Sequence, residues 1–310
     1  MTTNTKAMIP GRWFAIGMAL SLVAVAAMLI RAGLTIELAT ASGGIFCSAA
    51  VLAAGLRYRL RDPRAGWQRT ARDMAEYVGL FGLISLLGAV ASYPAAAAST
   101  GFVDPSLARI DHALHFSWIG WYDVVSAHPL LQRIGAAAYA SIFVTPALLL
   151  GYFACADRRA DARLFMATFW LAAVLTLLLF LRFPAEGPLA FLWHGPIPYM
   201  PASALYLSQL IPELRSHGIH DITLGNLHGL VCAPSFHTTS AVLYIATAWR
   251  ARPLRWPIIA LNIAMLLATP VEGTHYLTDM ICGALVAVAA IVVTGILIRM
   301  PWAQPRARLT

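Results

Sequence analysis

Charge is scarce in this chain: 12% of its 310 residues are charged and 59% are apolar, with a mean hydropathy of +0.70. Ordinary soluble domains carry roughly 25% charged residues. So few polar side chains cannot cover a water-facing surface, which excludes a soluble globular domain. The apolar segments have helical length, so the composition predicts an all-α polytopic membrane protein with one membrane domain over residues 1–310.

Cysteine is also rare, with four residues in the chain. Cys47 and Cys282 fall within apolar segments and Cys155 ends one, so the pattern excludes a disulfide framework. Cys232 lies near the polar motifs described below, and we expect a packing role for it. No internal repeat is visible, which disfavours a transporter built from inverted repeats.

The net charge of +8 lies in short arginine runs between apolar segments. This distribution is typical of a topology signal, and it argues against a nucleic-acid partner. About eight segments are long enough to cross a bilayer, three of them within residues 1–100. They are 13–31, 34–56, 75–94, 134–155, 163–182, 236–250, 254–270 and 276–299.

The arginines also predict the orientation of the helices. With eight crossings, 17 of the 22 basic residues lie on the side of the two termini, counting helix ends with their loops, and five lie on the other side. Both termini are therefore expected in the cytoplasm. The first segment is expected to be a retained helix rather than a cleaved signal peptide. All nine histidines fall on the opposite side, so we expect a functional site at the extracytoplasmic face.

Two polar stretches, 232–240 and 272–279, each lead into an apolar segment. One helix separates them, so both helix starts face the same side. Ser235 and Thr274 are candidate N-caps that would place His237 and His275 in first helical turns, where helix N-termini favour phosphate. Asp279 follows His275 by four residues, the spacing at which a carboxylate can orient an imidazole across one helical face.

These residues resemble motifs of the type 2 phosphatidic acid phosphatase superfamily, closest to its inositol phosphorylceramide synthase-like branch. Pro234 to His237 resembles the second motif, usually Pro-Ser-Gly-His, and His275 to Asp279 resembles the end of the third. Arg182 to Pro188 resembles a divergent first motif, and an upstream stretch running from Asp111 to Ser141 is similar to the entry region of that branch. The resemblance implies a catalytic core of the six-helix type over 104–299.

The resemblance also implies a mechanism without metal or other cofactor. His275 would attack phosphorus, Asp279 would orient it, and His237 would protonate the leaving alcohol. Arg182, Ser235 and Thr274 would bind the phosphate, and possible substrate contacts are Glu186, Tyr276 and His228. The third motif departs from the family pattern, because Thr269 and Ala268 stand where an arginine is common.

The sequence thus predicts a lipid phosphatase or phosphotransferase in a membrane of the bacterial inner-membrane type, acting on a lipid phosphate or phospholipid. Two alternatives stay open at this point. The first is an intramembrane zinc hydrolase with His237, His275 and Asp279 as ligands. The second is a proton-coupled transporter of lipids or solutes that uses the same residues as a relay. The lipid, the acceptor and the oligomeric state are not determined by the sequence.

Overall fold

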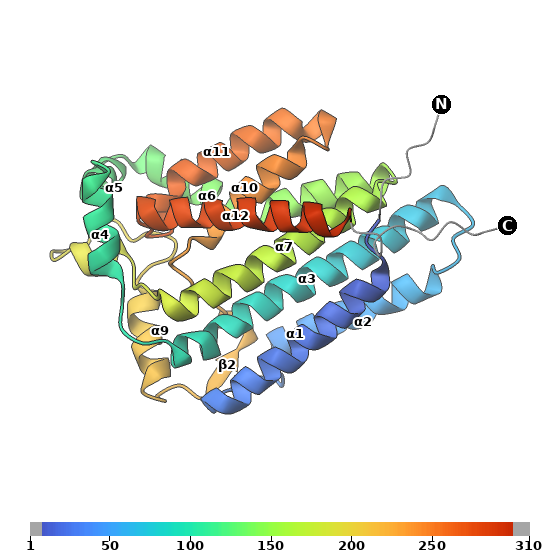
Figure 1. The fold of residues 1–310 in the computed structure, drawn as a ribbon, viewed down its shortest axis with the longest axis horizontal. Helices are drawn as coiled ribbons and strands as arrows, with labels where there is room; N and C mark the ends of the chain where they lie inside the picture. Colours follow the sequence, from blue (N-terminus) through green and yellow to red (C-terminus); the bar gives the residue numbers. More distant parts are fainter. Residues whose placement is uncertain (1–7, 300–310) are drawn as a thin grey trace.

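A computed structural model of the chain describes residues 8–299, and the long helices run side by side along one axis (Figure 1). The terminal segments 1–7 and 300–310, which are predicted to be cytoplasmic, lie outside the described residues. The helices are α1 (Gly11–Ala32), α2 (Ala41–Arg59), α3 (Gly66–Ala98), α4 (Asp104–Ala113), α5 (Trp118–Ser126), α6 (Pro129–Cys155), α7 (Arg159–Arg182), α8 (Pro188–Leu192), α9 (Tyr206–Arg215), α10 (Phe236–Ala248), α11 (Arg255–Glu272) and α12 (Leu277–Leu297).

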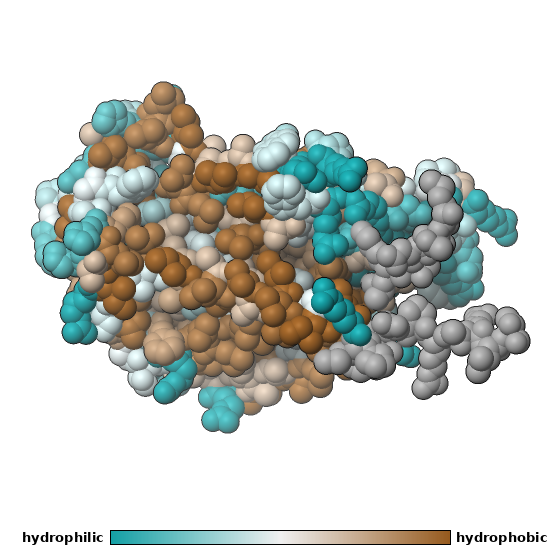
Figure 2. Space-filling model, turned by 45° about the horizontal axis from the view of Figure 1, so that its top comes forward, coloured by the Kyte–Doolittle hydropathy of each residue, from teal (hydrophilic) through white to brown (hydrophobic). Residues whose placement is uncertain are grey.

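The expected all-α membrane fold is confirmed. Seven of the described helices are long and apolar enough to cross a bilayer. Apolar side chains form a broad band around the middle of the molecule, and polar residues gather toward its ends (Figure 2). Lipid-facing apolar positions and a buried core of small and aromatic side chains share the same helices, which is the pattern expected when hydrocarbon is the solvent.

α10 is the exception among the eight expected crossings. Its 13 residues span about 20 Å at 1.5 Å per residue, less than the roughly 30 Å of hydrocarbon. The segment before it, 228–235, enters the bundle without helical structure. Three of its backbone N–H groups donate to other elements: His228 to the Tyr93 hydroxyl, Leu230 to Ser92 Oγ and Ser235 to the Asp279 carbonyl. The helix start that carries His237 is therefore enclosed by neighbouring chain.

α3 is longer than the sequence indicates, because it begins at Gly66 within the expected loop 57–74. Ion pairs hold its first turns. Glu76 contacts Arg57, Arg159 and Arg163 at 3.1, 3.5 and 2.6 Å. Much of the basic cluster expected to set topology is thus also an ion-pair network that ties α2, α3 and α7 together.

The opposite end of the bundle carries α4, α5, α9 and the long connections (Figure 1). Two short parallel strands, β1 (Thr35–Glu37) and β2 (Asp221–Thr223), join the α1–α2 connection to the long loop before α10. The N-terminal helices and the motif-bearing region therefore pack as one body at this end, where the ends of α10, α11 and α12 that carry the polar motifs also lie.

Candidate active site

His237 lies in the first turn of α10, as the sequence predicts. Ser235 is the N-cap, and its Oγ accepts a hydrogen bond from the Thr238 N–H at 3.3 Å. Tyr139 of α6 packs against the imidazole with ring centroids 3.9 Å apart, and its hydroxyl lies 3.0 Å from His237 Nδ1. Nδ1 is thereby occupied, so Nε2 is the nitrogen of His237 left for chemistry.

His275 does not lie in a helix, which corrects the expectation that Thr274 caps α12. α11 ends in a Schellman turn: the N–H of His275 donates to the Pro270 carbonyl, and that of Thr274 donates to the Val271 carbonyl. Thr274 takes the left-handed position of this turn, with φ +48°, although glycine is usual there. A β-branched residue at this backbone angle is strained, and such strain is concentrated at functional sites.

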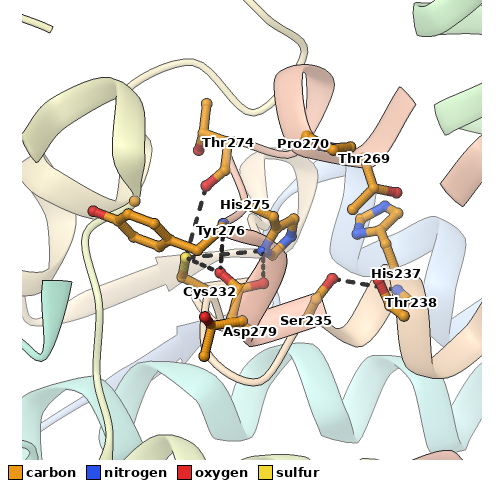
Figure 3. A network of polar contacts seen from close by, with 12 residues as sticks. Cys232, Ser235, His237, Thr238, Thr269, Pro270, Thr274, His275, Tyr276 and Asp279 are labelled. Atoms are coloured by element: carbon orange, nitrogen blue, oxygen red, sulfur yellow. Dashed lines mark hydrogen bonds and ion pairs between the residues drawn. The ribbon is translucent and has the colours of Figure 1, made fainter. Parts of the chain in front are cut away.

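His275 nevertheless meets Asp279 (Figure 3). Its Nδ1 lies 3.1 Å from Asp279 Oδ1, and both side chains are buried. Asp279 is the third residue of α12, and its Oδ2 accepts the N–H of Tyr276 at 2.9 Å. The pairing arises because the turn folds back onto the helix start, not because the two residues share a helical face. Asp279 therefore holds both the imidazole and the turn that carries it.

Gly273 lets His275 reach this position. A Cβ on Gly273 would lie 2.4 Å from His275 Cδ2 and 2.9 Å from the Thr269 carbonyl oxygen. No side chain fits there, since real Cβ contacts are essentially never so short. The Gly273-Thr274 pair thus combines a residue that must be small with a residue that is strained.

The N-terminus of α12 is already occupied, which corrects the expectation of a phosphate site there. Asp111 of α4 accepts the N–H groups of Leu277 and Thr278 at 2.9 and 2.8 Å and the Thr278 hydroxyl at 2.6 Å. A buried carboxylate on the positive end of a helix is a stabilising arrangement. Asp111 lies in the predicted entry region, and nothing along the chain reveals that it caps a helix 166 residues away.

Asp104, also on α4, makes a similar contact with the first motif. Its carboxylate accepts the N–H groups of Glu186 and Gly187 at 3.0 and 2.9 Å and the Tyr276 hydroxyl at 3.0 Å. Tyr276 is therefore a structural link between two motifs, although it was predicted as a possible substrate contact. Burial raises the pKa of Glu186, and the neighbouring Asp104 adds to this effect.

The two histidines face each other across the site, with ring centroids 6.4 Å apart. His237 is partly exposed, whereas His275 is 3% exposed. Cys232 lies on the far side of His275: its Sγ is 3.9 Å from His275 Nδ1 and 3.6 Å from Asp279 Oδ2. The sequence therefore placed Cys232 near the site correctly, but it contacts both residues instead of only filling space.

Two further residues of the predicted site, Arg182 and His228, make their contacts away from the histidine pair. Arg182 is exposed at the C-terminal end of α7, and within residues 8–299 no contact links it to His237 or His275. His228 stacks on Tyr206 with ring centroids 3.7 Å apart, and burial lowers its pKa. Their roles in substrate binding stay predictions.

A buried carboxylate at the end of α11 fixes the long loop over this region. Glu272, the last residue of α11, accepts hydrogen bonds from the Tyr199 hydroxyl at 2.7 Å and the Ala202 N–H at 3.1 Å. Ser203 continues the attachment, because its N–H donates to the Glu272 carbonyl and its hydroxyl lies 3.3 Å from Thr274 Oγ1. Residues 199–203 are thus held beside the turn that carries His275.

With this geometry established, comparison with known families gives one match: the family model described as PAP2 superfamily covers residues 105–293. The chain belongs to the PAP2 superfamily. The matched region runs from α4 to α12 and agrees with the resemblance drawn from the motifs. Membership supports a phosphatase-type activity on phosphate esters. Curated proteins and solved structures gave no significant match.

Proposed function

We propose that this PAP2 protein is a membrane lipid phosphatase or phosphotransferase that cleaves a lipid phosphate ester through a phosphohistidine. The observation that carries the proposal is the buried His275–Asp279 pair, 3.1 Å apart, facing His237 across the site. A nucleophile oriented by a carboxylate, opposite a second group able to move a proton, is the arrangement that two-step covalent catalysis requires.

The reaction divides between the two histidines. His275 Nε2 attacks phosphorus while the bond to the lipid alcohol breaks, and His237 donates the proton that the leaving oxygen needs. Water or a second alcohol then gives that proton back to His237 as its oxygen displaces His275 from phosphorus. Asp279, bound to Nδ1, keeps the lone pair of His275 on Nε2 and stabilises the positive charge that forms.

The phosphate must be bound with few cations. Thr269, which stands where the family commonly has arginine, is buried, and its hydroxyl donates to the Met265 carbonyl at 2.7 Å. Arg182 is the first candidate to bind the phosphate charge, by movement of its exposed side chain, and Ser235 adds a hydroxyl at the start of α10. Arg182→Gln should therefore raise KM more than it lowers kcat.

The test uses purified full-length protein with lipid phosphomonoesters and phosphodiesters. We expect phosphate or headgroup release by the wild type, and none above background by His275→Ala. His217→Ala, in the loop after α9, is the matched control and should retain activity. Rapid acid-free quenching after reaction with radiolabelled substrate should trap label on wild-type protein but not on His275→Ala. Equal turnover by His275→Ala would overturn the proposal.

The acceptor decides between hydrolysis and transfer. A second lipid alcohol is added to the assay. If the phosphohistidine reacts with alcohols, a new phosphorylated lipid should form. If it reacts with water alone, free phosphate should be the only product. Transfer of a phospho-headgroup would place the protein with the synthase-like branch of the superfamily.

We also propose that the site faces the outside of the cell membrane, which the arginine asymmetry supports. His194→Cys, in the exposed loop on the histidine side, should react with an impermeant thiol reagent in intact cells. Arg61→Cys, at the arginine-rich end, should react only after the membrane is opened. The reverse labelling pattern would contradict this orientation.

A further inference from the structure

Three chemically different ligand atoms converge beside the proposed nucleophile. Within residues 8–299, Cys232, His275 and Asp279 offer one thiol, one imidazole nitrogen and one carboxylate oxygen that all lie within 4.8 Å of one another (Figure 3). The set differs from the zinc ligands considered from the sequence, because Cys232 takes the place of His237. All three side chains are buried.

The spacing of these atoms agrees with a tetrahedral metal site. Zinc lies at about 2.3 Å from sulfur, 2.0–2.1 Å from nitrogen and 2.0–2.2 Å from oxygen, which places pairs of ligand atoms roughly 3.3–3.6 Å apart. The Sγ–Nδ1 and Sγ–Oδ2 distances are 3.9 and 3.6 Å, and Nδ1 lies 3.1 Å from the other Asp279 oxygen, Oδ1. Rotation of the carboxylate would bring one oxygen toward both partners, complete three vertices and leave the fourth for water.

We propose that Cys232, His275 and Asp279 bind a thiophilic divalent cation of the Zn²⁺ class, and that the bound cation switches the enzyme off. A mixed sulfur and nitrogen donor set with one oxygen selects such a cation over Mg²⁺ or Ca²⁺. The inhibitory part rests on the proposed function, whereas cation binding itself does not.

Inhibition follows from the identity of the ligand nitrogen. A cation on His275 Nδ1 displaces the contact with Asp279 and leaves the ring proton on Nε2. Nε2 then has no lone pair with which to attack phosphorus. Asp279 is drawn to the cation at the same time and no longer stabilises positive charge on the imidazole.

Binding must also release the thiol proton, since thiolate is the ligand form. The cation therefore takes the place of that proton on Cys232 Sγ. The cation would reach His275 by the route that the proposed substrate phosphate must also take.

The direct test uses full-length protein in which Cys47, Cys155 and Cys282 are replaced by serine, leaving Cys232 as the single thiol; all three are exposed on the bundle. Co²⁺ serves as the probe, because thiolate-bound cobalt has a strong charge-transfer absorption. We expect about one Co²⁺ per chain with this absorption, displaced by Zn²⁺. Adding Cys232→Ser or Cys232→Ala should abolish the absorption and weaken binding at least about tenfold.

His237→Ala is the matched control, because His237 lies outside the cluster: it should bind cobalt normally while losing activity. Persistence of the absorption in both Cys232 variants, or its absence from the parent protein, would overturn the site. A thermal unfolding curve for each variant shows whether the fold is kept, and the two replacements guard against failure of either one.

Activity tests the inhibitory part separately. Zn²⁺ should suppress phosphate release by the parent, and the Cys232 variants should need at least about tenfold more Zn²⁺ for the same loss. Activity that is abolished by chelation and restored by Zn²⁺ would overturn inhibition in favour of a zinc-dependent reaction. If no sample releases phosphate, the proposed function fails, and the cobalt spectrum still decides the site.

Discussion

Tyr139 stacks on His237 and places its hydroxyl 3.0 Å from Nδ1. The tyrosine belongs to α6 and the histidine to α10, so this contact fixes, from a separate helix, the imidazole proposed to transfer a proton. When His237 carries a proton on both nitrogens, the Tyr139 oxygen can accept one of them and leave the other directed at the leaving group.

Replacing Tyr139 should therefore lower kcat, and the loss should be larger for alanine than for phenylalanine. Tyr139→Phe removes the hydrogen bond but keeps the stack, and we expect kcat to fall about fivefold to tenfold, equivalent to roughly 1 kcal/mol. Tyr139→Ala removes both, with an expected loss of about 50-fold. Steady-state kinetics on the lipid substrate measures this. Equal activity of Tyr139→Phe and wild type would mean that the hydroxyl does not position His237.

Asp279→Asn tests whether the buried carboxylate acts in catalysis or only in folding. The amide oxygen can still accept the Tyr276 N–H, so the start of α12 should persist. The charge that would stabilise the His275 imidazolium is lost, and kcat should fall about 10⁴-fold, the scale seen when the acid of a triad is neutralised. Thermal unfolding in detergent should change little. Full activity would show that Asp279 is a helix cap alone.

Asp111 should matter for stability before it matters for chemistry. Asp111→Ala leaves two N–H groups and a hydroxyl at the α12 start without their acceptor, and we expect a loss of about 2 kcal/mol in unfolding free energy. Asp111→Asn keeps one acceptor oxygen and should lose about half as much. Chemical denaturation followed by circular dichroism distinguishes the two variants. An unchanged unfolding midpoint for Asp111→Ala would contradict the capping role.

Gly273→Ala should abolish most activity without unfolding the protein. The added methyl group would collide with His275 and displace the nucleophile, and a shift of about 1 Å can cost roughly 100-fold in rate. Gly82→Ala in α3 is the matched control, because a Cβ there meets nothing within 4 Å. Activity and melting temperature are measured for both. If Gly273→Ala retains wild-type kcat, His275 does not need this close approach.

The ion-pair network at the other end should support the bundle without affecting the reaction. Glu76→Gln leaves the Arg163 side chain, which is 7% exposed, without its carboxylate partner. We expect a loss of about 3 kcal/mol in unfolding free energy. Asp62→Asn is the control, since the Asp62 side chain is 90% exposed in its pair with Arg61 and should change stability little. Catalytic rate per folded molecule should stay constant in both. A comparable loss of unfolding free energy in the two variants would contradict a stabilising role of the network.

The amino-acid sequence was sufficient to predict the features that depend on local composition. Apolar runs of helical length predicted the membrane helices, and the motif residues identified His237, its cap Ser235, and the His275–Asp279 pair. The boundaries were less reliable. α3 begins nine residues before the expected 75–94 segment, because polar side chains in its first turns are satisfied by partners on α2 and α7 that hydropathy does not include.

The details of the site could not come from the sequence. The spacing of His275 and Asp279 suggested one helical face, but the same pair forms across a Schellman turn, since a left-handed Thr274 ends α11 two residues before Tyr276 caps α12. The expected phosphate site at α12 fails for a related reason: its donors bind Asp111, which lies far away along the chain.

The sequence by itself determined the solvent and the helices and predicted the candidate catalytic residues, because each depends on the character of short segments. Only the tertiary structure decided how those residues meet. Tyr139 against His237, Asp111 on α12 and Cys232 beside His275 are contacts between separate elements. Their distances follow from helix packing and turn geometry, which no local pattern encodes.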